Sequence, residues 1–239
     1  IDMVGCHRGV LARNRITSRS SSGIQAKGGS ADLLILANRI TDAGQRALNL
    51  GGSTGFEFFR PPLSTSADNA EGSRLVAAAN LIIGSVSPIA FVGCDGCSAL
   101  NNTLIDPDNW TVRILQETID RDGYSFLPSQ NGLFANNLMV FQRGQLSTDV
   151  NVGANTDPDS FVFASNLWFA SDQPGNSAPN LPVTETGAVI GEDPILDGDY
   201  RPMAGSPAIA AGQPQADVPG DANGECYADP PAIGAFATP

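Results

Sequence analysis

Three stretches, "IDMVGCHRGVLARNRI" (residues 1–16), "IQAKGGSADLLILANRI" (24–40) and "IAFVGCDGCSALNNTLI" (89–105), align with one another and decide the fold. Each opens with alternating apolar residues and reaches an asparagine 13 or 14 residues later, at Asn14, Asn38 and Asn102. The segments 48–55 ("LNLGGSTG") and 112–117 ("VRILQE") begin in the same way. The chain is therefore built from one repeated unit.

The repeat has a period of roughly 22 to 24 residues, with short strands and an asparagine at a fixed turn. This pattern predicts an all-β, single-stranded right-handed parallel β-helix in which each repeat forms one coil about 4.8 Å from the next. Asparagine suits the turn because it tolerates left-handed backbone angles and its amide can bond to the asparagine of the next coil. Asn80, Asn137 and Asn166 extend the series. Leucine-rich repeats have a similar period, but their leucine pattern is absent.

Alternation within the strands assigns their faces. The side chains predicted to point inward are those of Ile1, Met3, Ile24, Ala26, Leu48, Leu50, Ile89, Phe91, Val112 and Ile114. One outward column contains Asp2, Gln25, Asn49, Ala90 and Arg113, and the next contains Val4, Lys27, Gly51, Val92 and Leu115. Lys27, the only lysine, thus lies beside Gln25 and Asn49 on an exterior face, where bare Gly51 leaves room for a ligand.

Two insertions follow the same strand in different repeats, at residues 52–73 and 117–130. Long loops that leave one corner of a solenoid are expected to wall the same face and to carry function. These loops supply side chains suited to sugar stacking and binding: Phe56, Phe58, Phe59, Arg60, Tyr124 and Phe126. We predict the β-helix over residues 1–198, without its upstream coils or N-terminal cap, and an irregular capping segment over residues 199–239.

The overall composition limits the partners of the chain. Its formal net charge of −12 argues against nucleic-acid binding, which needs a basic patch. No apolar run approaches the ~20 residues of a membrane span. The acidic, lysine-poor composition fits a secreted or cell-surface protein, and the first residue, Ile1, suggests a mature or truncated product. The composition does not predict an oligomeric state.

Four cysteines occur, at positions 6, 94, 97 and 226. The "CDGC" pair has the spacing of half a zinc site, but no second pair exists and His7, which follows Cys6 in a turn, is the only histidine. Cys6 and Cys94 occupy equivalent positions three coils apart, beyond disulfide reach. We predict no Cys6–Cys94 bond; oxidised Cys94 pairs with Cys97, or one of those two pairs with Cys226.

The repeats around Lys27 and Gly51 and the C-terminal stretch resemble segments of the bacterial parallel β-helix proteins related to pectate lyases, especially those of the alginate lyase and chondroitinase B type. In that family a "VKS" strand precedes an "LRHG" strand by one coil. "QAKGGS" matches the first, so the resemblance implies that Lys27 is the Brønsted base, while Gly51 and Gly52 replace the arginine and histidine of the second. "AGSPAIAAG…PPAIGAFAT" resembles the family's closing "GSPAIDAG…DIGAFE", with Ala210, Ala232 and Ala237 replacing its acids.

The resemblance implies a polysaccharide lyase that cleaves uronates by β-elimination. In this reading Lys27 removes the proton, Arg46 or Arg113 favours its neutral amine, and Gln25 and Asn49 hold the carboxylate. Arg113 also suits a neighbouring sugar subsite. The loop residues Phe56, Phe58, Arg60, Tyr124 and Glu117 would contact substrate, and Asp32, Glu57 or Glu117 would recruit Ca²⁺ if a cation bridges the acidic polymer.

Three alternatives stay open at this point. Lys27 can be a plain surface cation bonded to a loop carbonyl, with Arg113 paired to Glu117. The chain can be a non-catalytic carbohydrate-binding or cell-surface module, which the missing arginine favours. It can also be a glycoside hydrolase, if Glu57 and Glu117 approach to about 5–9.5 Å.

Overall fold

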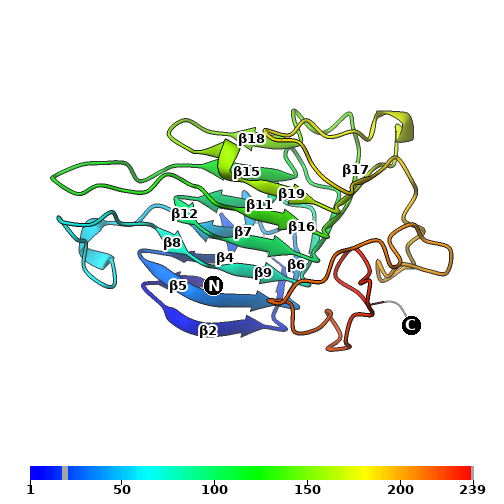
Figure 1. Ribbon diagram of the computed structural model, residues 1–239, viewed down its shortest axis with the longest axis horizontal. Coiled ribbons are helices and arrows are strands. Elements are labelled where there is room, and N and C mark those ends of the chain that lie inside the picture. The colour runs from blue at the N-terminus through cyan, green and yellow to red at the C-terminus, as the bar shows by residue number, and fades with distance from the viewer. Residues whose placement is uncertain (18–20, 238–239) are drawn as a thin grey trace.

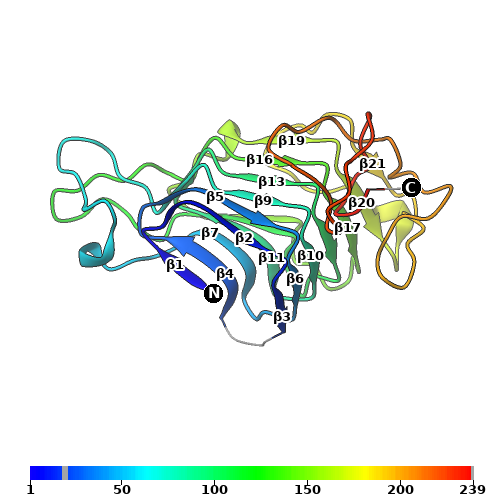
Figure 2. The same cartoon turned by 90° about the horizontal axis from the view of Figure 1, so that it is seen from below.

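The computed structural model describes residues 1–17 and 21–237, and its strands form three parallel sheets (Figures 1 and 2). Sheet 1 contains β1 (Asp2–Val4), β4 (Ser22–Lys27), β7 (Arg46–Gly51), β11 (Ser87–Val92), β15 (Val112–Leu115) and β18 (Val150–Val152). Sheet 2 contains β2 (His7–Ala12), β5 (Ser30–Leu36), β8 (Gly72–Ser73), β9 (Val76–Ala78), β12 (Cys94–Asp95), β13 (Ser98–Leu100), β16 (Leu133–Ala135) and β19 (Val162–Ala164). Sheet 3 contains β3 (Arg15–Thr17), β6 (Arg39–Thr41), β10 (Leu81–Ile83), β14 (Thr103–Ile105), β17 (Leu138–Phe141), β20 (Leu167–Ala170) and β21 (Val189–Ile190).

The chain visits the three sheets in turn and then starts the next coil, so the predicted parallel β-helix is confirmed. Short 3-10 turns interrupt the loops at η1 (Phe56–Phe58), η2 (Pro158–Ser160) and η3 (Pro174–Asn176). No helix among the described residues is long and apolar enough to cross a membrane.

The core of the solenoid is made by the side chains that alternation directs inward. Nearly all the residues predicted to point inward from sheet 1 are buried, including Ile24, Leu48 and Phe91 at 0% exposure. Ile1 is an exception, with 50% of its surface exposed. It immediately precedes β1, the edge strand of sheet 1 in the described residues.

The asparagines form a continuous ladder along the turn between sheets 2 and 3. Each one from Asn14 to Asn137 donates its backbone N–H and its side-chain amide to the Oδ1 atom of the asparagine in the next coil, at distances of 2.7–3.0 Å. The left-handed backbone angle falls on the residue before each asparagine, for example Ala79 (φ 52°) and Ser165 (φ 52°). The expected amide bonds between coils are confirmed, whereas the ladder asparagines do not themselves adopt the left-handed angle; at two turns another asparagine, Asn101 (φ 50°) or Asn136 (φ 55°), does so.

The segment after β21 lies along the outside of sheet 3 (Figure 1). Ile233 and Ala208 pack against Leu138 and Leu167 of sheet 3. Phe236 belongs to a second cluster, with Leu81 and Ile105 of the same sheet. The segment thus covers a side of the solenoid. The predicted domain boundary at residue 198 stays a prediction; the last sheet strand ends at Ile190.

Cys94 and Cys97 form a disulfide, with their Cα atoms 6.0 Å apart. Cys6 and Cys226 are free, so the prediction of no Cys6–Cys94 bond is confirmed. The bond closes the corner between β12 and β13, and both of its residues are buried in the core.

Candidate functional site

The strand register confirms the alignment of the column predicted to face outward from sheet 1, and two of its members, Asn49 and Ala90, are buried. Asp2 is the partner of Gln25, Gln25 of Asn49, Asn49 of Ala90, and Ala90 of Arg113. Because successive strands are stacked in register, these side chains form one line across five coils.

The polar members of this line bond mainly to one another. The Asn49 amide donates to Gln25 Oε1 (2.8 Å), and Gln25 Nε2 donates to Asp2 Oδ1 (3.2 Å). Asn49 Oδ1 accepts from Arg46 (3.3 Å), and its amide also donates to the Gly51 carbonyl (3.3 Å). Asn49 is 1% exposed. Its polar groups are already engaged within the protein, which leaves it few contacts to offer a sugar.

Glu117, the partner expected for Arg113 if the charges are plain surface charges, is bonded to another arginine. Arg46 forms the ion pair with Glu117, and among the described residues its buried Nε has no hydrogen-bond partner. Arg113 donates to Asn151 Oδ1 (3.0 Å) and lies 4.2 Å from the centre of the Trp110 ring. Burial lowers the pKa of the Arg113 guanidinium, and the charge of Arg46 lowers it further, whereas Glu117 opposes the shift.

The two inserted loops join into a single lobe, which we define as residues 52–71 and 116–130. Both project from the same end of the sheet-1 strands (Figures 1 and 2). Asn69 and Phe126 form an isolated parallel bridge between the loops. The Phe56 ring lies 5.5 Å from both Tyr124 and Phe126, and Phe59 lies 5.7 Å from Phe126. Most of the aromatic side chains proposed for sugar stacking therefore form the small core of the lobe.

Glu71 ties the lobe to the solenoid, and sequence reasoning missed it. This carboxylate is 1% exposed and accepts from four donors: the backbone N–H groups of Gly28 and Thr54 and the hydroxyls of Thr54 and Thr118. Its sequence neighbours, "NAEGS", repeat nothing elsewhere in the chain, so periodicity gave no signal for it. Trp110 was also missed; its position three residues before Arg113 was the available clue.

Gly51 does not leave room for a ligand, which corrects the sequence-based expectation. Gly51 is buried and its φ is +92°, a left-handed angle that favours glycine. A Cβ at this position would overlap the carbonyl oxygen of Val92 and would meet the Cβ of Glu71 at 3.5 Å. The arginine that the resembled family carries here cannot be accommodated without moving the backbone.

Lys27 lines an open pocket of about 540 Å³ at the first coils, between sheet 1 and the lobe. Its Nζ lies 3.3 Å from the Ser53 carbonyl and 3.8 Å from Asp2, and its side chain is 19% exposed. Arg60 and Phe58 line the same pocket, and Phe58 is 58% exposed. We call this the Lys27 pocket; it brings together three of the residues predicted from the sequence.

No protein-family model matches this chain, and a search of curated proteins found no match either. The assignment of function therefore rests on the geometry of its own residues.

The acidic residues considered for Ca²⁺ and for hydrolysis are dispersed. Asp32 makes a bidentate pair with Arg74 on sheet 2, and the guanidinium holds the pKa of this carboxyl below its usual value. Glu117 pairs with Arg46, while Glu57 is exposed on η1, and no contact joins them in the part of the chain that the structure describes. Within those residues, no group of three His, Cys, Asp or Glu side chains can hold a metal ion. His7 Nε2 lies 2.9 Å from the Arg60 carbonyl, to which it donates.

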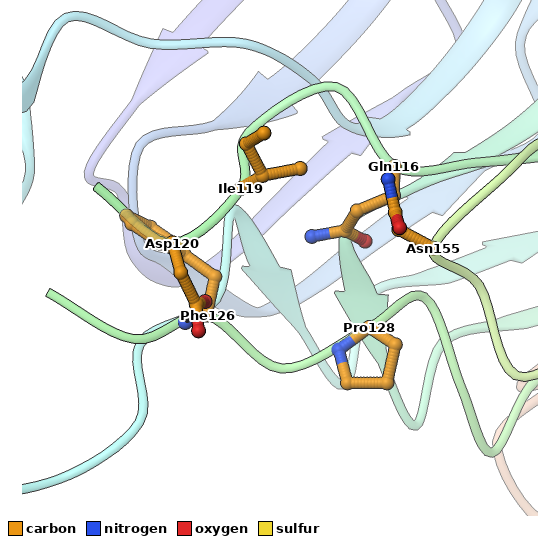
Figure 3. A pocket seen from close by; sticks show the side chains of 6 residues that line it. All are labelled: Gln116, Ile119, Asp120, Phe126, Pro128 and Asn155. Carbon is orange, nitrogen blue, oxygen red and sulfur yellow. Dashed lines mark hydrogen bonds between the residues drawn. The ribbon is translucent and has the colours of Figure 1, made fainter.

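A second pocket, of about 320 Å³, is lined by the second loop of the lobe and by Asn155, which follows β18 (Figure 3). Gln116 donates to the carbonyls of Thr118 and Leu127 and accepts from the Ser129 N–H. Asp120 accepts from the Phe126 N–H at 2.8 Å. These polar groups hold the loop in shape, so the Lys27 pocket is the stronger candidate site.

Proposed function

We propose that the chain is an exported β-helix protein that binds an acidic, uronate-containing saccharide in the Lys27 pocket. The observation that carries the proposal is the convergence of Lys27, Arg60 and the exposed ring of Phe58 around one opening. The whole chain has a net charge of −12, whereas the charged side chains of this pocket, Lys27, Arg60 and Asp2, sum to a positive charge.

Each of these groups has a role suited to a uronate. The Lys27 ammonium and the Arg60 guanidinium provide charge-assisted donors for the sugar carboxylate. The Phe58 ring offers an apolar face to the C–H face of a sugar ring. Asp2, 3.8 Å from Lys27 Nζ, competes for the ammonium and would also accept from a sugar hydroxyl.

β-Elimination is the second candidate function. It is favoured by the place of Lys27 on β4, where the resembled lyases carry their base, and by its access to the pocket. It is disfavoured at Gly51, where the backbone excludes the family's arginine, and because Lys27 Nζ is engaged by Ser53 and Asp2. Binding without cleavage is therefore the function that the geometry supports best.

An extracellular location accords with the Cys94–Cys97 disulfide, because such bonds persist in oxidising compartments. The likeness to pectate-lyase-type proteins, which accords with the parallel β-helix, likewise points to a polysaccharide partner.

The test is titration calorimetry with uronate oligosaccharides, with and without Ca²⁺, and with neutral oligosaccharides of equal length. We expect the uronates to bind and Lys27→Gln or Arg60→Gln to weaken binding at least about tenfold, since a charge-assisted hydrogen bond contributes about 1.5–3 kcal/mol. Arg74→Gln, which removes a guanidinium from sheet 2, is the matched control and should bind as the wild type does.

Cleavage is followed in the same samples by ultraviolet absorbance, which rises when elimination creates a conjugated double bond. A rise that Lys27→Gln abolishes would replace binding by lyase activity as the function. If wild type neither binds nor cleaves any uronate, the proposal fails.

A further inference from the structure

A second cationic pocket lies on another side of the solenoid, between sheet 3 and the C-terminal segment. It has a volume of about 370 Å³ and is lined by Arg15, Arg39 and Arg201, together with Asp199, Asn223 and Phe236. Figure 1 shows the C-terminal segment, in red, beside β6. The sequence repeat does not predict this pocket, because half of its lining residues belong to the C-terminal segment, outside the repeat.

Two arginines on adjacent strands line the sheet-3 side of the pocket. Arg15 of β3 and Arg39 of β6 are register partners in adjacent parallel strands. The next residue on β6, Ile40, is fully buried, so Arg39 points to the outside. Like charges directly opposite each other on neighbouring strands are destabilising. Within the described residues, neither guanidinium forms an ion pair or a side-chain hydrogen bond.

The wall of the pocket adds a third guanidinium. Arg201 lies over the Phe236 ring, 5.6 Å from its centre, and Phe236 is itself 5% exposed and packed against the solenoid. The one carboxylate of the lining, Asp199, lies 4.0 Å from Arg201, and both side chains are about half exposed or more. Three guanidinium groups thus face one carboxylate, which leaves a local charge of +2.

From this arrangement we propose that the pocket binds a tetrahedral oxyanion, a phosphate or sulfate group, either free or as the ester of a larger ligand. Inorganic sulfate and the dianions of phosphate and of its monoesters match the charge of the pocket; a sulfate ester, with one negative charge, would match only the geometry of the donors. The planar guanidinium presents paired N–H donors that suit phosphate and sulfate oxygens. Bound between Arg15 and Arg39, the anion also removes the repulsion that this pair carries without it.

The site is separate from the Lys27 pocket, which lies on sheet 1. Its occupancy therefore does not depend on the proposed binding of uronates, and each proposal can fail while the other holds.

The experiment is titration of the purified chain with inorganic phosphate and inorganic sulfate at constant ionic strength in chloride, with acetate as the monoanion. We expect phosphate or sulfate to bind and acetate to bind weakly. Arg39→Gln and Arg15→Gln should each weaken the binding about tenfold, since each removes a charge-assisted contact. Arg74→Gln, paired with Asp32 on sheet 2, and Lys27→Gln serve as controls and should leave it unchanged.

Hexose phosphate and hexose sulfate form the second arm; tighter binding of an ester than of the free anion identifies an ester as the ligand. Circular dichroism of each variant verifies that the exposed substitutions leave the solenoid folded. The proposal is overturned if neither anion binds better than acetate, if Arg39→Gln binds like wild type, or if Lys27→Gln abolishes anion binding.

Discussion

The asparagine ladder and the Glu71 hub, by which we mean the Glu71 carboxylate and its four donors, are two buried polar systems with different hydrogen-bonding patterns. In the ladder, each side chain from Asn38 to Asn137 gives both amide hydrogens and receives two hydrogen bonds on its oxygen. At the hub, one carboxylate receives four donors and gives none. Both systems satisfy buried polar groups, as folding requires.

The difference follows from the chemistry of the two groups. An amide both donates and accepts, so it can be repeated in every coil without limit. A carboxylate only accepts, so it can gather several donors at one place but cannot pass the pattern on. The ladder accordingly ends where Asn166 meets a carboxylate, Glu185. The solenoid thus uses asparagine amides, which continue the hydrogen-bonding pattern from coil to coil, and the lobe is held by the Glu71 carboxylate, which ends such a pattern.

The largest effect is expected in the middle of the ladder, from Asn102→Ala. The substitution leaves the Asn80 backbone N–H and amide without their acceptor and removes a donor from the Ala77 carbonyl. We expect a loss of at least about 3 kcal/mol in the free energy of unfolding, since each buried group left unpaired costs about 1–3 kcal/mol. Denaturant unfolding followed by circular dichroism measures it.

The matched control is Asn14→Ala at the start of the ladder. Asn14 is half-buried and its side chain donates to Asn38 and, at 3.3 Å, to the Ala12 carbonyl. We expect this variant to lose about 1 kcal/mol, the net contribution of an ordinary hydrogen bond. Equal losses in the two variants would show that the ladder is not the stabilising device described above.

The hub should show an intermediate and local effect. Glu71→Gln replaces one acceptor oxygen by an NH₂ group, which faces donors such as the Thr54 or Gly28 N–H. We expect the lobe to open about tenfold more often, since one unpaired buried donor costs about 1–3 kcal/mol. The measurement is the rate of proteolytic cleavage, or of amide hydrogen exchange, within residues 52–71 and 116–130.

Glu57→Gln is the control for the hub, because it makes the same chemical change on an exposed part of the same lobe. Its lobe should open as in wild type. A Glu71→Gln variant whose lobe stays closed while the whole chain unfolds more easily would place Glu71 in the solenoid core instead.

The contrast also explains how far the sequence alone could lead. Repetition made the coils, the inward and outward columns and the Asn102 turn predictable, because each coil meets the same environment. Phe56 and Tyr124 pack against each other through a contact between two loops that no period relates. Arg39 and Arg201 face one pocket because the last segment folds back over sheet 3, and nothing in the repeat sets that path. Pairings between unrepeated segments depend on three-dimensional packing, which composition and spacing do not encode.

The smallest effect concerns the carboxylate that ends the ladder. Burial raises the pKa of Glu185 above its ordinary value of 4.5, while hydrogen bonds from Asn166 and Trp168 oppose the shift. A carboxyl group whose folded-state pKa is raised contributes full stability below the unfolded pKa and loses it as pH rises through the folded value. Glu185→Gln cannot ionise, so the stability of wild type relative to this variant should fall as pH rises above 4.5. Denaturant midpoints of both proteins from acid to neutral pH measure this difference, in which all shared titrating groups cancel. A difference that grows with pH would mean that the ionised carboxylate, like that of Glu71, is stabilised by the donors it gathers.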